Sequence, residues 1–186
     1  MKVNLKKVRI AFPALFEAKT VNGEGEPRFS AAFVIDPSSE NAKALAAALK
    51  ETAVAKWGAK AEGILSELKK KGRVCYVEGP KTNGNGEVYD GFEDMHSLNA
   101  SNKARPLVLD RDKSPLTAAD GRPYGGCYVN AVVELWAQDN NFGKRINATL
   151  KGVQFDKDGD AFGGGAPASP DDFEDLGVDE EESLAG

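Results

Sequence analysis

The residues of this chain that could do chemistry are aromatic rings and cations, because the usual catalytic and metal-binding groups are scarce. One histidine, His96, and two cysteines, Cys75 and Cys127, are too few and too scattered for a zinc site or a disulfide framework. Histidine is the side chain most often used for proton transfer near neutral pH. We therefore expect no enzyme activity, no catalytic residue, no metal or other cofactor, and two reduced thiols.

Rings and cations share one face of a predicted hairpin. Residues 126–137 and 144–151 both alternate apolar and polar side chains, which is typical of half-buried β-strands. If the two strands pair, Tyr128 and Trp136 lie on the outer face beside Arg145 and Lys151. Rings stack on exposed bases at about 1–3 kcal/mol per base, and cations bind phosphates. The pattern indicates binding of single-stranded nucleic acid, unless a helical segment covers these rings.

The elements that position this hairpin are further strands and one helical insertion. Residues 7–12 and 28–35 show the same alternation, with Val8, Ile10 and Phe12 predicted to face inward. Asp36 to Ser39 supply residues that stop a strand and cap a helix, and helical spacing then continues over about 39–71 with a break at Gly58. A short strand at 73–78 and a turn at 83–86 follow. We predict a mainly β fold with one helical insertion.

The net charge of −5 conceals two segments of opposite charge. Residues 171–186 contain eight acidic and no basic residues, so residues 1–170 have 21 acidic and 24 basic residues and a charge of about +3. The predicted partner-binding tail consists of Asp171, Asp172, Phe173, Glu174, Asp175, Asp179, Glu180, Glu181 and Glu182. A mildly basic body with an acidic tail is compatible with nucleic acid as a partner.

The domain boundary is predicted near residue 160. Residues 162–170 have the glycine and proline content of a flexible linker, so we assign 1–160 to the folded domain and 161–186 to a linker and disordered acidic tail. No apolar stretch is long enough to span a membrane, and the first residues lack the apolar core of a signal peptide. We expect a cytoplasmic protein that does not bind membranes.

An ordered set of short motifs resembles the phage single-stranded DNA-binding proteins that were long catalogued as a phage domain of unknown function. The motifs are Tyr89-Asp90-Gly91-Phe92, residues 99–112, Tyr124 to Ala131, Val153-Gln154-Phe155, Gly163-Gly164-Gly165 and Asp171-Asp172-Phe173. The resemblance covers nearly the whole chain. It implies an OB-fold-like antiparallel barrel with a helical insertion, in the cytoplasm of the bacterial host. It also implies an acidic tail that recruits replication proteins (polymerase, helicase or primase) and competes with DNA. The tail ends without an aromatic residue, which departs from the family pattern.

The motifs and the strand pattern together give the candidate binding residues. The aromatic candidates for base stacking are Tyr89, Phe92, Tyr124, Tyr128 and Trp136. The candidates for phosphate contacts are Lys7, Arg9, Lys81, Lys103, Arg105, Arg111, Lys144, Arg145 and Lys151. Phe29, Phe33 and Tyr76 are expected in the core, and Trp57 is expected to anchor the end of a helix.

The sequence leaves alternatives open. A protein-interaction or virion assembly module would use the tail to dock a partner and would keep its outer rings covered. A metal-dependent nuclease is a third alternative, but Asp110 and Asp112 have no third ligand to complete a metal site. The sequence does not determine the oligomeric state, for which a homodimer is one alternative.

Overall fold

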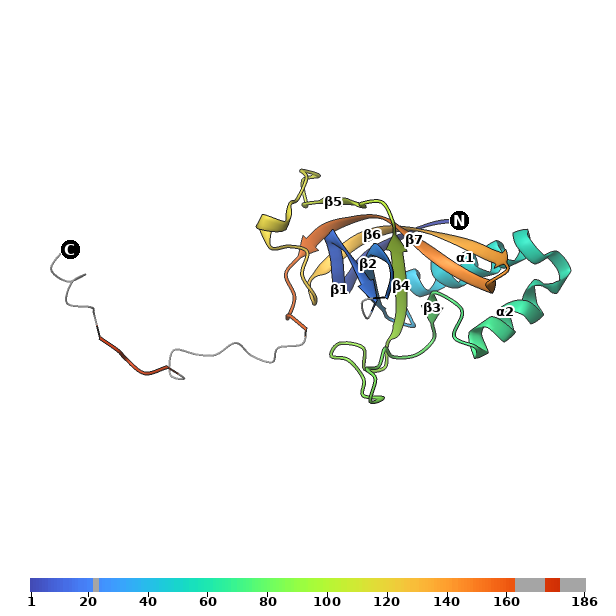
Figure 1. Cartoon of the computed structure of the whole chain (residues 1–186), viewed down its shortest axis with the longest axis horizontal. Helices are drawn as coiled ribbons and strands as arrows, with labels where there is room; N and C mark the ends of the chain where they lie inside the picture. The colour runs from blue at the N-terminus through green and yellow to red at the C-terminus, as the bar shows by residue number, and fades with distance from the viewer. Residues whose placement is uncertain (22–23, 163–172, 178–186) are drawn as a thin grey trace.

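The computed structural model describes residues 1–21, 24–162 and 173–177. Seven strands and two α-helices are formed by these residues (Figure 1). The strands are β1 (Lys2–Val21), β2 (Glu24–Ile35), β3 (Tyr76–Val77), β4 (His96–Asn102), β5 (Leu107–Leu109), β6 (Tyr128–Asn140) and β7 (Gly143–Lys157). The helices are α1 (Glu40–Trp57) and α2 (Ala61–Lys70), with short 3-10 turns at Gly58–Lys60 and Ala118–Asp120.

Five of the strands form a closed barrel. β1 pairs with β2 and β6, β2 with β4, and β6 with β7, all antiparallel. A short parallel contact between Ser101 of β4 and Thr149 of β7 closes the ring, and the Asn102 side chain donates a hydrogen bond to the Leu150 carbonyl at 2.9 Å beside it. The predicted OB-fold-like barrel is confirmed, but it is a mixed barrel because this closing pair is parallel.

Period-two alternation correctly predicts the inner face of β6 and β7. Val129, Val133 and Leu135 of β6, and Cys127 just before it, are at most 1% exposed. Ile146, Ala148 and Leu150 of β7 are buried against them. The outer face of the hairpin carries Tyr128, Trp136 and the cations of β7, as the alternation predicts.

The alternation fails in β1, where two bulges interrupt it. Lys7 and Phe12 adopt positive φ angles of 52° and 50°, and the pairing register of β1 shifts between Leu5 and Val8 and between Ala11 and Ala14. A bulged residue is added to one strand only and reverses the face on which later side chains lie. Ala11 is therefore buried and Phe12 is 52% exposed, so the prediction that Phe12 faces inward is wrong.

The predicted insertion at 39–71 is the α1–α2 unit at one end of the barrel (Figure 1). The Ser39 hydroxyl accepts a hydrogen bond from the Ala42 N–H at 3.2 Å and caps α1. Gly58, with a φ of 57°, ends the helix, as the sequence predicts. Leu45, Leu49 and Ala53 on the buried face of α1 join the same core as the barrel side chains.

Packing against the barrel continues to Phe162, two residues past the predicted boundary. The Phe162 ring lies 6.5 Å from the buried Phe92 ring, and the Phe162 N–H donates to the Gly125 carbonyl at 2.9 Å. Phe173, Glu174 and Asp175 of the predicted tail are exposed, whereas Asp171, Asp172 and Asp179 to Glu182 lie outside the described residues. None of the helices in the described ranges is long and apolar enough to cross a membrane.

We expect Leu135→Ala to lower the free energy of unfolding by about 2–5 kcal/mol, because Leu135 is 1% exposed and its truncation leaves a cavity in the barrel core. Urea denaturation measures this change. Leu107→Ala, at a side chain that is 61% exposed, is the control and should change stability by about 0.5 kcal/mol or less. Equal effects of the two substitutions would contradict this description of the core.

Candidate nucleic-acid interface

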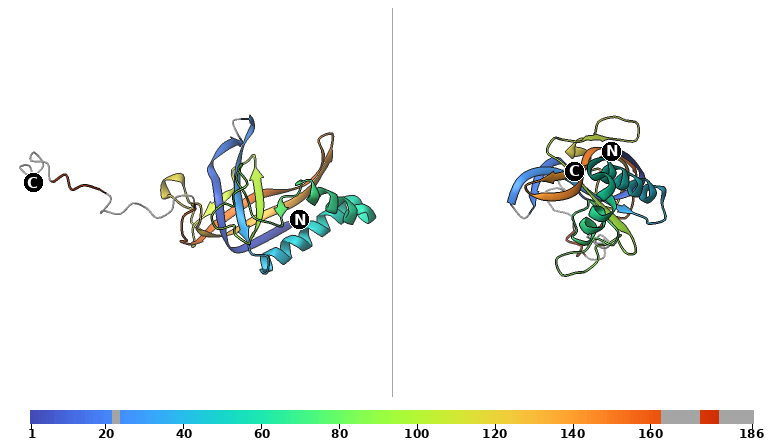
Figure 2. Two further views of the ribbon diagram at one scale, coloured as in Figure 1. Left: turned by 90° about the horizontal axis from the view of Figure 1, so that it is seen from below. Right: turned by 90° about the vertical axis from the view of Figure 1, so that its right-hand side faces the viewer.

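A groove of about 640 Å³ crosses the barrel over the β4–β7 closure. It is lined by residues of β1, β2, β4, β6 and β7 and of the segment from Gly72 to Lys81. The β1–β2 and β6–β7 hairpins extend beyond the barrel on the same side, with β4 between them (Figure 2). The hairpins thus form the two sides of the groove.

The floor of the groove consists of strand backbone and small polar side chains. Ser30 of β2, Ser101 of β4 and Thr149 of β7 line it, together with Ala31, Ala100 and Ala148, which are at most 5% exposed and belong to the barrel core. A larger side chain at Ser30, Ser101 or Thr149 would occupy space between the hairpins.

Three cations, Arg28, Lys81 and Arg145, line the groove. Arg28 donates to the Ser101 hydroxyl at 3.0 Å, and the Lys81 amine donates to the Asn99 side-chain oxygen at 3.0 Å. The Arg145 guanidinium has no hydrogen-bond or ion-pair partner within the described part of the chain. None of the described lining residues is acidic. The Glu26 carboxylate lies near Arg28 but is ion-paired with Lys103. The cations of the groove thus form no ion pair with a described residue, which suits an anionic ligand.

Two exposed rings line the groove as well. Trp136 of β6 is 43% exposed, and its indole N–H donates to the Thr149 hydroxyl at 3.1 Å. Phe12 of β1 is 52% exposed, and its ring lies 4.8 Å from the Tyr89 ring in an edge-to-face arrangement. The helical insertion does not cover Trp136. Both rings therefore present surface on which a flat group can stack.

Burial changes the ionisation of two groups in the groove. It lowers the pKa of the Lys81 amine, because the charged form is partly removed from water. It raises the pKa of the Cys75 thiol to about 12, so Cys75 remains a thiol near neutral pH and is not an activated nucleophile. Among the described residues, no three His, Cys, Asp or Glu side chains are grouped so that they could hold a metal ion.

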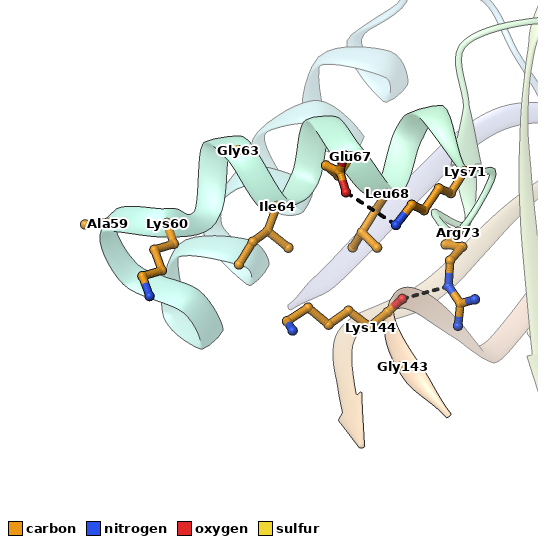
Figure 3. Close-up of a pocket in the computed structure, with 10 residues that line it drawn as sticks. All are labelled: Ala59, Lys60, Gly63, Ile64, Glu67, Leu68, Lys71, Arg73, Gly143 and Lys144. Carbon is orange, nitrogen blue, oxygen red and sulfur yellow. Dashed lines mark hydrogen bonds and ion pairs between the residues drawn. The ribbon is translucent and has the colours of Figure 1, made fainter. Parts of the chain in front are cut away.

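Arg73 and Trp57 hold the β6–β7 hairpin against the helical insertion. The Arg73 guanidinium donates to the carbonyl of Lys144 at 2.9 Å and to the carbonyl of Phe142 at 2.8 Å. Figure 3 shows the bond to Lys144 at the edge of a separate cleft of about 700 Å³ between α2 and the hairpin tip. The Trp57 indole donates to the Asp139 carboxylate at 3.0 Å, as expected of a helix anchor. These bonds position the strands that carry Trp136 and Arg145.

The structure places most of the predicted cations outside the groove. Four are paired with carboxylates: Lys103 with Glu26 at 2.9 Å, Arg111 with Asp156 at 3.0 Å, Lys151 with Glu134 at 3.6 Å, and Lys144 with Asp139 at 3.9 Å. Arg105 donates to the Phe16 carbonyl at 3.0 Å. Lys7 lies exposed at a bulge of β1. Of the predicted cations, Lys81 and Arg145 are the ones that line the groove.

Arg9 contacts other parts of the protein and does not line the groove. Its guanidinium donates to the carbonyls of Gly126 at 3.0 Å and Asp160 at 2.6 Å, and it lies 4.2 Å from the centroid of the Phe162 ring. These contacts fasten the segment after β7 to the barrel. Because these contacts occupy the guanidinium, Arg9 is not one of the residues that we propose for phosphate contacts.

Of the five predicted aromatic residues, Trp136 lines the groove and the other four lie elsewhere. Phe92 is 0% exposed in a cluster with Ala11, Ala32 and Val34, so the prediction that it stacks on bases is corrected. Tyr124 is half-buried, and its hydroxyl donates to Asp158 at 2.8 Å. Tyr128 is half-buried beneath the Lys157 amine, which lies 4.8 Å from its ring. Tyr89 lies against Phe12 at the edge of a second cavity.

Sequence reasoning missed Phe12, Arg28 and the amides of the groove. The bulge at Phe12 has no clear signature in a single sequence. Arg28 is the first residue of the predicted strand 28–35, on the face that also carries Ser30, so its position could have been inferred from the alternation. Asn99, Gln138 and Asn147 supply polar groups along the groove.

Comparison with known protein families gives a match along nearly the whole chain. The model of the family described as "Enterobacter phage Enc34, ssDNA-binding protein" matches residues 1–184. Protein p50 of Acyrthosiphon pisum secondary endosymbiont phage 1 is 47% identical to this chain over 187 residues, which cover 99% of this chain and 98% of p50.

Solved structures of phage proteins share the fold. The single-stranded DNA-binding protein from bacteriophage Enc34 in complex with ssDNA has a TM-score of 0.70 at 24% identity, covering 87% of this chain and 89% of that chain. The protein gp2.5, a single-stranded DNA-binding protein encoded by bacteriophage T7, has a TM-score of 0.57 at 11% identity, covering 96% of this chain and 97% of that chain. At these identities the matches establish the fold.

We expect the Lys81 amine to lose its proton at a lower pH than an ordinary lysine, for which the pKa is 10.5, because burial disfavours its charged form. An NMR titration of the lysine side chains measures the midpoint, and the signal that disappears in Lys81→Arg identifies Lys81. A midpoint at or above 10.5 would show that the amine is fully hydrated and would contradict its placement in the groove.

Proposed function

The chain belongs to the family of phage single-stranded DNA-binding proteins that the protein of Enterobacter phage Enc34 represents, and we propose that it binds the single strand in the groove over the β4–β7 closure. The family assignment confirms the resemblance inferred from the sequence motifs. It also places the chain among DNA-binding proteins and not among enzymes.

One observation carries the proposal: none of the groove cations forms an ion pair with a described residue, whereas carboxylates pair with four of the predicted cations outside it. Lys81 and Arg28 donate to Asn99 and Ser101, so an incoming phosphate meets positive charge that is already positioned. Charge-assisted hydrogen bonds to phosphate are stronger than the neutral ones they replace. Phosphates therefore have a favourable path along the groove.

Stacking of bases on aromatic rings is the second part of the proposed interaction with DNA. Trp136 and Phe12 line the groove with exposed faces, and base stacking on such rings does not depend on sequence. In OB folds generally, oligonucleotides bind the face of the second and third barrel strands and the two loops beside it. Here β2 and β4 are the second and third strands of the barrel, and the two extended hairpins occupy the positions of those loops. Binding without strong sequence preference follows from this arrangement.

We infer that the acidic tail competes with DNA for the groove. Arg9 fastens Asp160 and Phe162 to the barrel, and Phe162 lines a cavity that shares the Phe12 wall with the groove. The described part of the domain therefore ends at Phe162, beside a cavity that adjoins the groove, and the sequence of the acidic tail follows from there. Its carboxylates can occupy the positions that phosphates would take.

The tail is also the proposed docking element for replication proteins, such as a polymerase, helicase or primase, in the cytoplasm of the bacterial host. Phe173 and Leu176 are 71% and 90% exposed among acidic residues. A basic site with an apolar centre on a partner would bind such a segment. This role supports DNA replication or recombination of a phage.

The first test of the function is a mobility-shift titration against single- and double-stranded DNA at several salt concentrations. We expect preference for the single strand and an affinity that falls with salt, with a log-log slope of about −0.7 for each phosphate neutralised. Arg145→Ala should make the slope less steep by about 0.7, and Lys113→Ala, outside the groove, should not change it. Affinity that does not depend on salt would contradict the electrostatic part of the proposal.

Removal of either exposed ring of the groove should weaken binding. We expect Trp136→Ala and Phe12→Ala each to raise the Kd for a single strand by about 5- to 150-fold, which corresponds to about 1–3 kcal/mol per stacked base. Phe142→Ala is the matched control, because Phe142 is 83% exposed but does not line the groove. DNA should also quench the tryptophan fluorescence of wild type, which comes from Trp57 and Trp136, and Trp136→Phe should abolish this quenching. Unchanged fluorescence would favour a protein-interaction module.

Truncation after Phe162 should tighten DNA binding at low salt, because it removes the competing carboxylates and keeps the ring that packs on Phe92. A full-length variant with Asp179→Asn, Glu180→Gln, Glu181→Gln and Glu182→Gln should shift the Kd in the same direction by a smaller factor. Equal or weaker binding by the truncated protein would refute competition by the tail.

A further inference from the structure

A second cavity, of about 470 Å³, lies next to the groove. Phe12 lines both of them. The segment between β3 and β4 also reaches both, since Lys81 lines the groove and Val88 and Tyr89 line the cavity. Residues 81–89 of this segment form a small hairpin in which Thr82 pairs with Val88 (Figure 1). A strand that leaves the groove past Phe12 therefore meets the second cavity.

The walls of this cavity are rings in fixed positions. The Phe12 and Tyr89 rings contact each other edge to face, with their centroids 4.8 Å apart. The Phe162 ring, which also lines the cavity, lies 4.2 Å from the Arg9 guanidinium and directly over Gly91. The φ of Gly91 is +85°, and a Cβ at this residue would overlap the Phe162 ring, so the close approach requires glycine. The space between these walls is preformed and has aromatic surfaces suited to a flat group.

The polar groups of the cavity differ from those of the groove. Glu87 and Asp90 line it, both are exposed, and neither forms an ion pair with a described residue. None of the described lining residues is a cation. Phosphate is therefore disfavoured, whereas a carboxylate accepts hydrogen bonds from the amino groups of nucleobases. Cytosine, adenine and guanine carry an exocyclic amine, and thymine presents carbonyl oxygens in its place.

We propose that this cavity is a base-binding subsite, in which one nucleobase of the bound strand lies between the rings and directs its exocyclic amine to Glu87 or Asp90. The inference rests on the proposed function of the groove. The groove binds bases without sequence preference, and the subsite adds one position at which thymine is disfavoured. The sugar and phosphates of that nucleotide remain on the side of the groove, where the cations lie.

Binding of the full-length protein to oligo(dC) and oligo(dT) of equal length tests the proposal. The quantity to compare is the ratio of the Kd for oligo(dT) to the Kd for oligo(dC), measured by fluorescence anisotropy for wild type and for Glu87→Gln/Asp90→Asn. Removing two negative charges raises affinity for both strands alike, so the ratio cancels this effect. We expect the ratio to fall about fivefold in the variant, because a charge-assisted hydrogen bond becomes a neutral one.

The control is Glu51→Gln/Glu62→Gln, which removes two exposed carboxylates from the helical insertion and should leave the wild-type ratio unchanged. A ratio that is the same in wild type and in Glu87→Gln/Asp90→Asn would overturn the base-binding subsite and leave the function of the groove intact. Absence of binding to either oligonucleotide by wild type would instead overturn the proposed function, and the subsite with it.

Discussion

The parallel contact between β4 and β7 closes the barrel, and the groove depends on how short this contact is. A single residue pair, Ser101 with Thr149, joins the two strands, and the Asn102 side chain adds one hydrogen bond. Beyond this point β6 and β7 continue as a hairpin and diverge from β2 and β4 (Figure 2). A longer ladder would draw the hairpin onto the barrel and leave no space over the serine and threonine side chains of the floor.

Ion pairing distinguishes several cations elsewhere on the surface from the cations of the groove. A surface ion pair contributes little to stability, but it does lower the local potential that an anion experiences. Lys103, Arg111 and Lys151 each form an ion pair with a carboxylate, whereas the hydrogen-bond partners of Lys81 and Arg28 are neutral side chains. The groove thus presents cations that form no ion pair with a described residue. Net charge alone would not have revealed this distribution.

Much of the fold could be predicted from local patterns, because strand alternation and helix caps depend on neighbouring residues. The β6–β7 hairpin, the α1–α2 insertion and the cap at Ser39 are examples. The site was predicted less well, because it depends on pairings between residues far apart in the chain. The partner of a cation such as Lys103 is set by the tertiary fold, and the outward turn of Phe12 is set by a bulge. Phe92 lies in the segment before β4, and its burial depends likewise on contacts with Ala11 of β1 and with Ala32 and Val34 of β2.

Hydrogen bonds from Arg73 and Trp57 connect the helical insertion to the β6–β7 hairpin, which forms one side of the groove. Neither residue lines the groove itself. Native proteins open locally as well as globally, and an element held by few contacts opens first. Fraying of the end of α1 or of the turn after α2 would release the hairpin tip while the barrel stays folded. The geometry of one side of the groove is therefore set by the local stability of helices that lie outside it.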